Sequence, residues 1–144
     1  MTYFDTSYLV RLYWNDPGHE IVRDLAGRAT DVCCGWHGRV ELIAAFHRKY
    51  REGAATREVF VGLLRQFHLD EKEGGLTWLP LTDQVMEHVE RIFTDLPRDV
   101  YLRSADALHL ACAVESGLAE IYTNDRHAIA AAPYFGLRGI NVIL

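Results

Sequence analysis

The sequence predicts an α/β protein in which helices cover both faces of a central, mostly parallel β-sheet. The first reason is that short apolar segments alternate along the chain with longer segments of helical periodicity, and parallel strands need such helical crossovers. The second is size, because 144 residues with 49% hydrophobic content can bury a core without disulfides. No repeat, low-complexity tract or linker interrupts the chain, so we expect residues 1–144 to form a single domain.

The first half of the chain is predicted to hold two strands and several helices. Thr2–Phe4 is typical of a short strand, and a helix over 7–14 follows it. Pro17 suits the first turn of a helix, so a second helix is expected to begin after the sequence Asp-Pro-Gly. Apolar periodicity and the glycine stop at position 53 then predict a strand over 31–35 and helices over 39–51 and 55–68.

The second half continues the alternation of strands and helices. Residues 76–81 are typical of a strand, after which Thr82 opens a helix that Pro97 ends. Ser104 is predicted to cap the next helix, which reaches residue 116. Two further strands are expected over 120–123 and 141–144.

Composition excludes several classes of protein. Three cysteines, two of them adjacent, do not form a disulfide framework or a zinc motif, so we expect buried, inert thiols and a cytoplasmic protein. The N-terminus lacks the progression of an export signal, and no segment has the ~20 apolar residues of a membrane span. A net charge of −5 argues against a protein that coats nucleic acid, but it permits an enzyme with a local basic rim.

Two aspartates occupy the same local setting. Asp5 and Asp125 each follow a predicted strand and precede a predicted helix. The bland interpretation is a helix N-cap, because an aspartate oxygen satisfies the free amides of a first turn. The functional interpretation is that ligands of open parallel sheets bind at the carboxyl ends of strands. The repetition of the setting favours function.

Two further acids lie on predicted helices. Asp106 is in a first helical turn, where the helix dipole favours a carboxylate whether or not it has a function. Glu41 is the only charge in an apolar helical run over 40–46, which indicates a largely buried helix. Such a carboxylate needs a salt bridge, for which Arg39 and Arg48 are candidates, or a bound cation.

The four acids become a single site if their strand ends and helix starts meet at one edge of the sheet. Their mutual repulsion would then raise their pKa values and destabilise the fold unless a divalent cation lay among them. Oxygen ligands favour Mg²⁺ or Mn²⁺. A metal ion held by carboxylates suits phosphodiester hydrolysis, because it activates water and polarises the phosphoryl oxygens without a protein nucleophile.

Several motifs surround these acids in a characteristic order and spacing. They are Tyr3-Phe4-Asp5-Thr6-Ser7, Val40-Glu41-Leu42 with Ala44-Ala45-Phe46, Ser104-Ala105-Asp106-Ala107-Leu108-His109-Leu110-Ala111, and Tyr122-Thr123-Asn124-Asp125. With these motifs the chain resembles the PIN-domain family, and within it the VapC-type toxins of bacterial toxin–antitoxin pairs. The resemblance spans nearly the whole length.

The resemblance implies a metal-dependent endoribonuclease. It assigns metal-binding and catalytic roles to Asp5, Glu41 and Asp106, with Asp125 as a fourth acid that acts directly or through water, and it matches Thr6 and Thr123 to supporting hydroxyl positions. It further implies Mg²⁺ or Mn²⁺ as the cofactor, RNA as the substrate, a homodimer, and a cognate antitoxin whose tail blocks the acidic pocket. No acid of the pattern is missing.

Basic and histidine residues near the acids have open roles. Arg39, Arg103 and Arg126 each lie within three residues of an acid, where they either contact the scissile phosphate or offset carboxylate repulsion. His109, one turn after Asp106, is either a proton shuttle or an ordinary packed or surface residue.

Two alternative functions use the same residues. The first is a non-catalytic module that binds RNA or a protein partner on the same scaffold. The second is a phosphatase of the haloacid dehalogenase type with Asp5 as nucleophile, but Ser7 stands where that family places a second aspartate, which counts against it.

Overall fold

The computed structural model describes residues 1–143 of the chain, and all of its strands run parallel. Strands β1 (Thr2–Tyr3), β2 (Val32–Gly35) and β3 (Leu76–Leu79) pair in that order. A second ladder pairs β4 (Glu120–Tyr122) with β5 (Arg138–Ile140). One bridge between Phe4 and Tyr122 joins the two ladders, so the strands follow the order β3-β2-β1-β4-β5.

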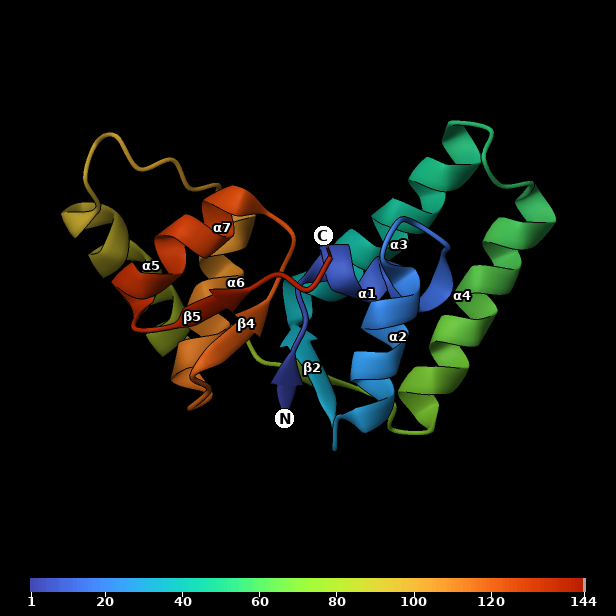
Figure 1. The fold of residues 1–144 in the computed structure, drawn as a ribbon, viewed down its shortest axis with the longest axis horizontal. Helices are drawn as coiled ribbons and strands as arrows, with labels where there is room; N and C mark the ends of the chain where they lie inside the picture. Colours follow the sequence, from blue (N-terminus) through green and yellow to red (C-terminus); the bar gives the residue numbers. More distant parts are fainter. Residues whose placement is uncertain (144) are drawn as a thin grey trace.

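Helices lie on both sides of the sheet. Figure 1 shows the first four helices on one side and the later ones on the other, which confirms the predicted three-layer α/β/α class. The helices are α1 (Thr6–Tyr13), α2 (His19–Arg28), α3 (Trp36–Arg51), α4 (Arg57–Lys72), α5 (Asp83–Asp95), α6 (Ser104–Glu115) and α7 (Arg126–Ala131), followed by the 3₁₀ turn η1 (Ala132–Phe135).

The strand order places a topological switch between β1 and β4. The chain runs from β1 through β2 to β3 in one direction and then crosses back to β4 and β5 on the other side of β1. Right-handed crossovers put the helices of these two directions on opposite faces of the sheet. The crevice at the carboxyl ends of β1 and β4 is therefore the place where an open parallel sheet binds ligands.

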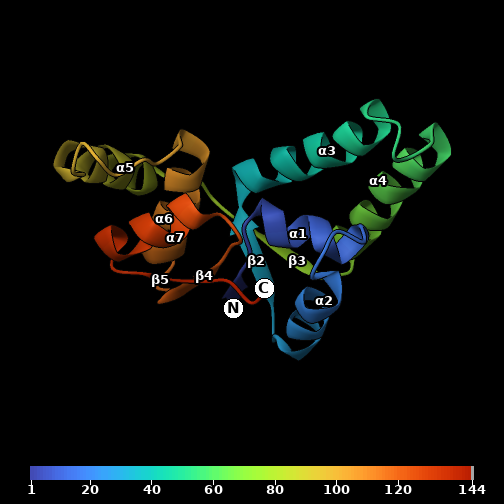
Figure 2. The ribbon, with the colours of Figure 1, turned by 45° about the horizontal axis from the view of Figure 1, so that its top comes forward.

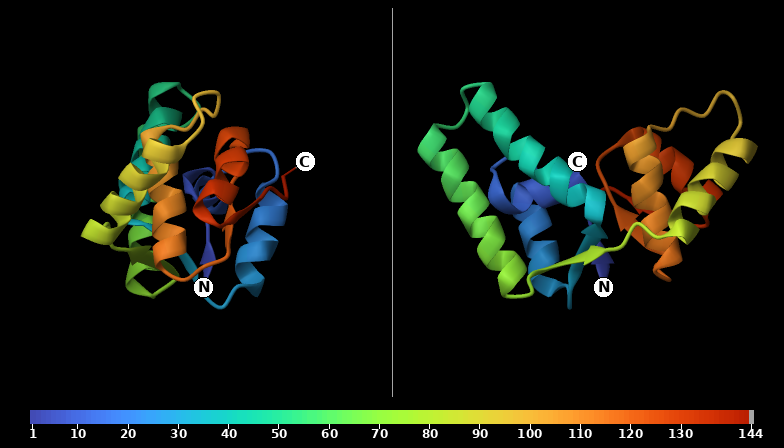
Figure 3. Two further views of the ribbon diagram at one scale, coloured as in Figure 1. Left: turned by 90° about the vertical axis from the view of Figure 1, so that its left-hand side faces the viewer. Right: turned by 180° about the vertical axis from the view of Figure 1, so that it is seen from behind.

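Two pairs of helices project away from the sheet. Figures 2 and 3 show the α3–α4 pair and the α5–α6 pair diverging as two arms, while α3 and α6 remain in contact with each other. A close approach brings α3 onto β2, because a side chain at Gly38 would collide with the sulfur of Cys34. The core then buries Phe4, Leu42 and Leu110 completely between sheet and helices.

The helix starts differ in detail from the sequence prediction. Helix α3 begins at Trp36, three residues before the expected start, and α4 begins after Thr56, whose hydroxyl accepts from the Val59 amide. The prediction that Ser104 caps α6 was wrong. Arg103 is the N-cap residue, and Ser104 is the first helical residue.

The last strand also lies elsewhere. The strand is Arg138–Ile140 rather than 141–144, and Leu144 is outside the described residues. The Tyr8 hydroxyl donates to the Asn141 side chain and accepts from the Val142 amide. The Ile143 amide donates to the same Asn141 side chain, so residues 141–143 make these contacts in place of a strand ladder.

Helix α3 is only half buried, which contradicts the expectation of a largely buried helix. Gly38, Leu42 and Phe46 face the core, whereas the side of the helix that carries Val40, with 68% of its surface exposed, faces solvent. The reason is that α3 leaves the sheet as one of the two arms. Glu41 therefore lies at the boundary between core and solvent, with 36% of its side chain exposed.

The cysteines follow the sequence prediction. Cys33, Cys34 and Cys112 are all free and buried. Burial raises the pKa of Cys33 and of Cys112 to about 12, so these two thiols are unreactive at neutral pH. Among residues 1–143, no helix combines the length and apolarity needed to cross a membrane.

Candidate active site

Asp5 lies where β1 ends and α1 begins. Its Oδ1 accepts from the Tyr8 amide at 3.2 Å and from the Ser7 hydroxyl at 2.5 Å, so the capping interpretation is correct. Its own amide donates to the Tyr122 carbonyl of β4 at 3.1 Å. Burial raises the pKa of Asp5, and His109 and nearby hydroxyls offset only part of that rise. The cap is thus also a buried carboxylate at the topological switch.

Asp125 occupies the equivalent place after β4. Its Oδ1 caps α7 by accepting from the amides of His127 and Ala128. Its amide donates to the Thr123 hydroxyl at 3.0 Å, and Thr123 is completely buried. Because β1 and β4 are neighbours, Asp5 and Asp125 lie at the same edge of the sheet.

Asp106 and Asp125 share one arginine. Arg103 Nε donates to Asp106 Oδ2 at 2.9 Å, and Arg103 Nη2 donates to Asp125 Oδ2 at 2.8 Å. Two acids that are 19 positions apart in the sequence therefore lie within reach of a single guanidinium. Of the two roles left open for Arg103, this structure shows charge compensation.

Glu41 has partners that the sequence did not indicate. Its Oε1 accepts from the Thr6 hydroxyl at 2.9 Å and from His109 Nε2 at 2.7 Å. Burial alone would raise the pKa of Glu41, but the contacts with His109 and Thr6 outweigh burial, so the pKa lies below its ordinary value. The proposed salt bridges to Arg39 and Arg48 were wrong, because those residues pair with other acids, Glu71 and Glu52 respectively.

His109 is a buried polar residue that links the core to Glu41. Its Nδ1 lies 2.7 Å from the Tyr3 hydroxyl, which in turn accepts from the Gly35 amide at 2.9 Å. Burial opposes a charged ring, but Cys34 and Glu41 raise the pKa of His109 above its ordinary value. With 3% of its surface exposed and its ring against Tyr3, His109 is a packed residue, as one of the alternatives expected, and not a surface residue. It orients the Glu41 carboxylate.

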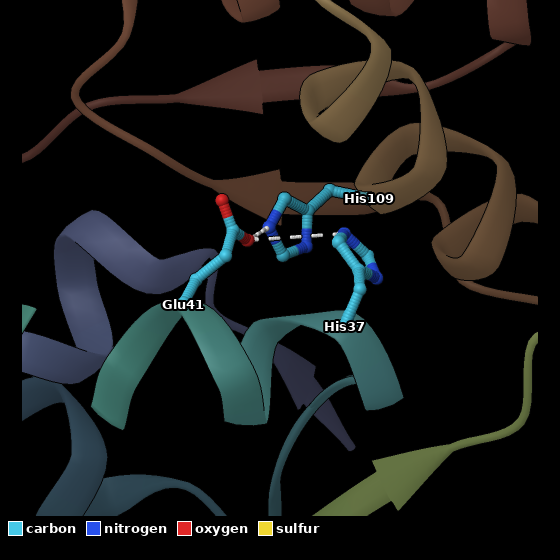
Figure 4. A group of neighbouring side chains, drawn as sticks. All are labelled: His37, Glu41 and His109. Atoms are coloured by element: carbon cyan, nitrogen blue, oxygen red, sulfur yellow. Dashed lines mark hydrogen bonds and ion pairs between the residues drawn. The ribbon is translucent and has the colours of Figure 1, made fainter. Parts of the chain in front are cut away.

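His37 completes a group of possible metal-ligand atoms with Glu41 and His109. Figure 4 shows the three side chains converging from α3 and α6, and their donor atoms lie within 4.8 Å of one another. Burial and His109 lower the pKa of His37 to about 4, so its ring is neutral. However, His37 Nε2 is bonded to the Ala105 carbonyl and His109 Nε2 to Glu41. Hydrogen bonds therefore use the Nε2 atom of each ring, whereas His37 Nδ1 is buried without a partner among the described residues. We interpret this group as support for Glu41.

Hydroxyl groups connect Asp5 with Glu41 and with the turn that carries Asp125. Glu41 accepts from Thr6, the residue that follows Asp5. Ser7 donates to Asp5 and accepts from the amide of Asn124, the residue before Asp125. Ser7 was not predicted as part of the site. Its position two residues after the cap is the only sequence signal for it.

Charged or titratable side chains connect the remaining acids. Arg103 joins Asp125 to Asp106. One helical turn after Asp106, His109 reaches back to Glu41. These contacts connect the four predicted acids with one another, and we call the group of Asp5, Glu41, Asp106 and Asp125 the acidic pocket.

Two predicted basic residues have no contact with these acids. Arg39 donates to both carboxylate oxygens of Glu71, at 2.8 and 3.0 Å, and lies over the Phe67 ring. Arg126 is exposed and has no ion pair among residues 1–143. The structure therefore assigns a contact with the acidic pocket to Arg103 alone of the three arginines.

Comparisons with known proteins agree with this fold. The structure is similar to that of VapC20 from Mycobacterium tuberculosis, described as a sarcin-ricin loop cleaving toxin, with a TM-score of 0.66 and 19% identity over 91% of this chain and 95% of that one. It is also similar to VapBC2 from Rickettsia felis, solved with a DNA fragment of its promoter (TM-score 0.69, 15% identity, 98% of each chain), and to FitAcB from Neisseria gonorrhoeae (TM-score 0.64, 17% identity, 98% and 97%).

Sequence comparison places the chain in a family. A search of curated proteins gave no match. The family model of the PIN domain, in contrast, matches residues 2–133, a range that includes all four acids of the pocket. The chain therefore belongs to the PIN domain family.

Proposed function

We propose that this chain is a divalent-metal-dependent endoribonuclease and the toxin of a type II toxin–antitoxin pair. In this proposal residues 1–144 act as one nuclease domain. Asp5, Glu41, Asp106 and Asp125 bind Mg²⁺ or Mn²⁺ in the acidic pocket, and an RNA phosphodiester is hydrolysed there.

One observation carries the proposal. Asp106 and Asp125 come from separate elements, yet each directs an oxygen at the same guanidinium, at 2.9 and 2.8 Å. Carboxylates repel one another, so a fold that assembles them needs a positive charge among them. A pocket that already holds one cation between two of its acids has the electrostatics of a cation site.

The donor set fits a hard divalent ion. The four side chains offer carboxylate oxygens only, which are the ligands that Mg²⁺ and Mn²⁺ prefer. The pocket opens to solvent on the side of Asp125 and Glu41, whose side chains are 22% and 36% exposed. When bound, such an ion activates water and stabilises the charge that develops on the phosphoryl group.

The protein's own groups then have distinct tasks. Thr6 and His109 orient Glu41, and Thr123 supports the turn that carries Asp125. Because Arg103 lies between two of the acids, its guanidinium is the candidate to contact the scissile phosphate. Arg39 and Arg126 have at most an indirect part in substrate binding.

The similar structures support the choice of substrate and partner. VapC20 is described as a toxin that cleaves the sarcin-ricin loop, an RNA element. VapBC2 is described as bound to a DNA fragment of its promoter, and another similar structure is FitAB bound to a DNA fragment, at 15% identity and a TM-score of 0.61. By analogy, we propose a cognate antitoxin that covers the acidic pocket, a homodimer, and a cytoplasmic location.

A cleavage assay tests the proposal. The purified chain is incubated with a mixed pool of tRNA, rRNA and mRNA in Mg²⁺, Mn²⁺ or EDTA, and the products are mapped by sequencing. We expect cleavage that needs the metal and falls by about a hundredfold or more in Asp5→Asn and in Asp106→Asn. The control is Asp24→Asn, which removes an exposed carboxylate paired with Arg28 outside the pocket.

The same assay separates the alternative function. A non-catalytic module that binds RNA or a protein partner would leave the RNA intact under every metal condition. Its RNA binding, measured by gel shift, would be the same for the wild type and Asp106→Asn. Intact RNA under every metal condition would refute the nuclease proposal, whereas equal binding with cleavage by the wild type alone would support it.

A further inference from the structure

Arg103 is placed to compete with a metal ion. It is the N-cap residue of α6, and its guanidinium reaches back over the first turn to Asp106 and across to Asp125. Asp106 is almost completely buried at its side chain, whereas 57% of the Arg103 side chain is exposed. The charged head of a long, exposed side chain thus enters the pocket from the solvent side.

The contacts of Arg103 use oxygens of two proposed metal ligands. Both bonds end on an Oδ2 atom, one from each aspartate. The hydrogen bond and the charge of Asp106 raise the pKa of Arg103, so the guanidinium stays charged at every physiological pH. A carboxylate oxygen that accepts a hydrogen bond from a guanidinium is less available to a divalent ion. The two cations therefore bind the same part of the pocket in competition.

Building on the proposed function, we propose that Arg103 is a built-in competitor of the metal ion, which exchanges Asp106 and Asp125 for an RNA phosphate when the ion binds. The exposure of the side chain allows this exchange without unfolding of α6. The planar guanidinium binds a phosphate as well as it binds a carboxylate. The displaced Arg103 guanidinium would therefore contact the RNA phosphate next to the bond that is cut.

The other two arginines near the acids are not equivalent. Arg39 donates through both Nε and Nη2 to Glu71, so its guanidinium is already held in a two-bond pair with another carboxylate. Arg126 follows Asp125 directly but makes no ion pair among the described residues. Arg126 therefore provides a matched control, because its removal deletes the same charge near the same acid without breaking a bond to an acidic oxygen.

The first experiment measures metal binding without any reaction. Mn²⁺ is titrated into the full, metal-free chain by isothermal titration calorimetry at neutral pH, for wild type, Arg103→Ala and Arg126→Ala. We expect Arg103→Ala to bind Mn²⁺ about three- to tenfold more tightly, the size expected for loss of partly exposed ion pairs. Arg126→Ala should change the dissociation constant by about twofold at most, because salt screens a charge that makes no contact.

The second experiment measures the effect on RNA. At saturating Mn²⁺, Arg103→Ala should raise KM for RNA or lower kcat by about tenfold, the loss expected for one phosphate contact. Metal affinity and RNA cleavage would then change in opposite directions. A residue with a merely structural role would weaken both.

Three outcomes overturn the inference. Unchanged or weaker Mn²⁺ binding by Arg103→Ala would do so, and the proposed function would survive if the wild type still cut RNA with Mn²⁺. If Arg126→Ala gained as much Mn²⁺ affinity as Arg103→Ala, the loss of one positive charge near the acids would explain the effect without competition. No Mn²⁺ binding and no cleavage by the wild type would refute both proposals. If circular dichroism shows that Arg103→Ala is unfolded, Arg103→Gln, which keeps the stem of the side chain, takes its place in both experiments.

Discussion

The two halves of the acidic pocket are stabilised in different ways. Asp5 and Glu41 accept hydrogen bonds from hydroxyl groups, a backbone amide and the buried His109. Asp106 and Asp125 are instead joined by the charge of Arg103. The side-chain donors to the first half are buried or partly buried, whereas the second half is held by a side chain that is more than half exposed.

The difference shows how a fold can tolerate crowded carboxylates. Buried or partly buried hydrogen-bond donors hold the oxygens of Asp5 and Glu41 in one arrangement, whatever the solution contains. A guanidinium on a flexible stem neutralises the other two acids but can leave when a stronger cation arrives. We therefore expect substitutions in the first half to change geometry, and substitutions in the second half to change charge.

Among the tests of this comparison, the largest effect is expected from the support of Glu41. His109→Leu removes the donor to Glu41 and should lower RNA cleavage by about 10- to 100-fold, the range found when second partners of metal ligands are lost. His109→Gln retains a side-chain donor and should recover most of the activity. A control is His88→Leu, which removes a histidine paired with Glu115 outside the pocket.

The readouts must separate positioning from stability. Thermal unfolding gives the folded fraction of each variant, and kcat, KM and Mn²⁺ affinity are then compared per folded molecule. If His109→Leu lost only stability, its corrected kcat and Mn²⁺ affinity would match those of the wild type. That result would contradict the idea that His109 holds Glu41 in a fixed position for catalysis.

A smaller effect is expected in the stability of the metal-free protein. Burial raises the pKa of Asp5, which means that the ionised carboxylate is destabilised in the fold. Asp5→Asn keeps a capping oxygen and removes the charge, so it should raise Tm by about 3 °C. Asp106→Asn should give no rise, because it takes one partner from Arg103. Equal shifts in the two variants, measured by differential scanning calorimetry in EDTA, would contradict the comparison.

The smallest effect is a pair of opposite pH dependences in the first half. The pKa of Asp5 is raised on folding, so its contribution favours the fold at low pH and is lost as pH rises through the folded pKa. The gain from Asp5→Asn should therefore be absent below the ordinary pKa of 3.8 and grow as pH rises. The pKa of Glu41 is lowered, so its contribution is present above its ordinary pKa of 4.5 and is lost as pH falls through the folded pKa.

Urea unfolding of the metal-free chain between about pH 3 and pH 7 measures both dependences. Glu41→Gln should cost stability at pH 7 and cost less in acid, the reverse of Asp5→Asn. The Glu41 effect is the weaker of the two, because solvent reaches more than a third of its side chain. If the change in unfolding free energy depended on pH in the same way for both variants, the two acids would not differ in the direction of their pKa shifts.

Much of the fold follows from local signals in the sequence. Alternation of short apolar strands with helices predicts the parallel sheet, and Thr82 caps α5 as expected. Asp5 and Asp125 follow their strands and cap their helices because a strand end, a short polar side chain and a helical run lie within a few residues of each other. Glu41 and Asp106 were selected from their apolar or helix-start setting in the same local way.

Other features depend on residues that are distant in the sequence. The choice of Arg39 or Arg48 as partner of Glu41 was wrong because α3 directs them to Glu71 and Glu52, while His109 arrives from a helix 68 positions later. The last strand was misplaced because Tyr8 binds the backbone and side chain of residues 141–142. Periodicity carries no information about either contact.

The sequence by itself determined which acids the chain offers and that Asp5 and Asp125 cap helices, since hydrogen bonding and amphipathicity act over one or two turns. Only the tertiary structure decided which groups stabilise these acids. His109 and two hydroxyls donate hydrogen bonds to one half, and Arg103 forms ion pairs with the other. The physical reason is that electrostatic and hydrogen-bond partners are selected by distance in space, and that distance exists only after the strands β1 and β4 have come to lie side by side.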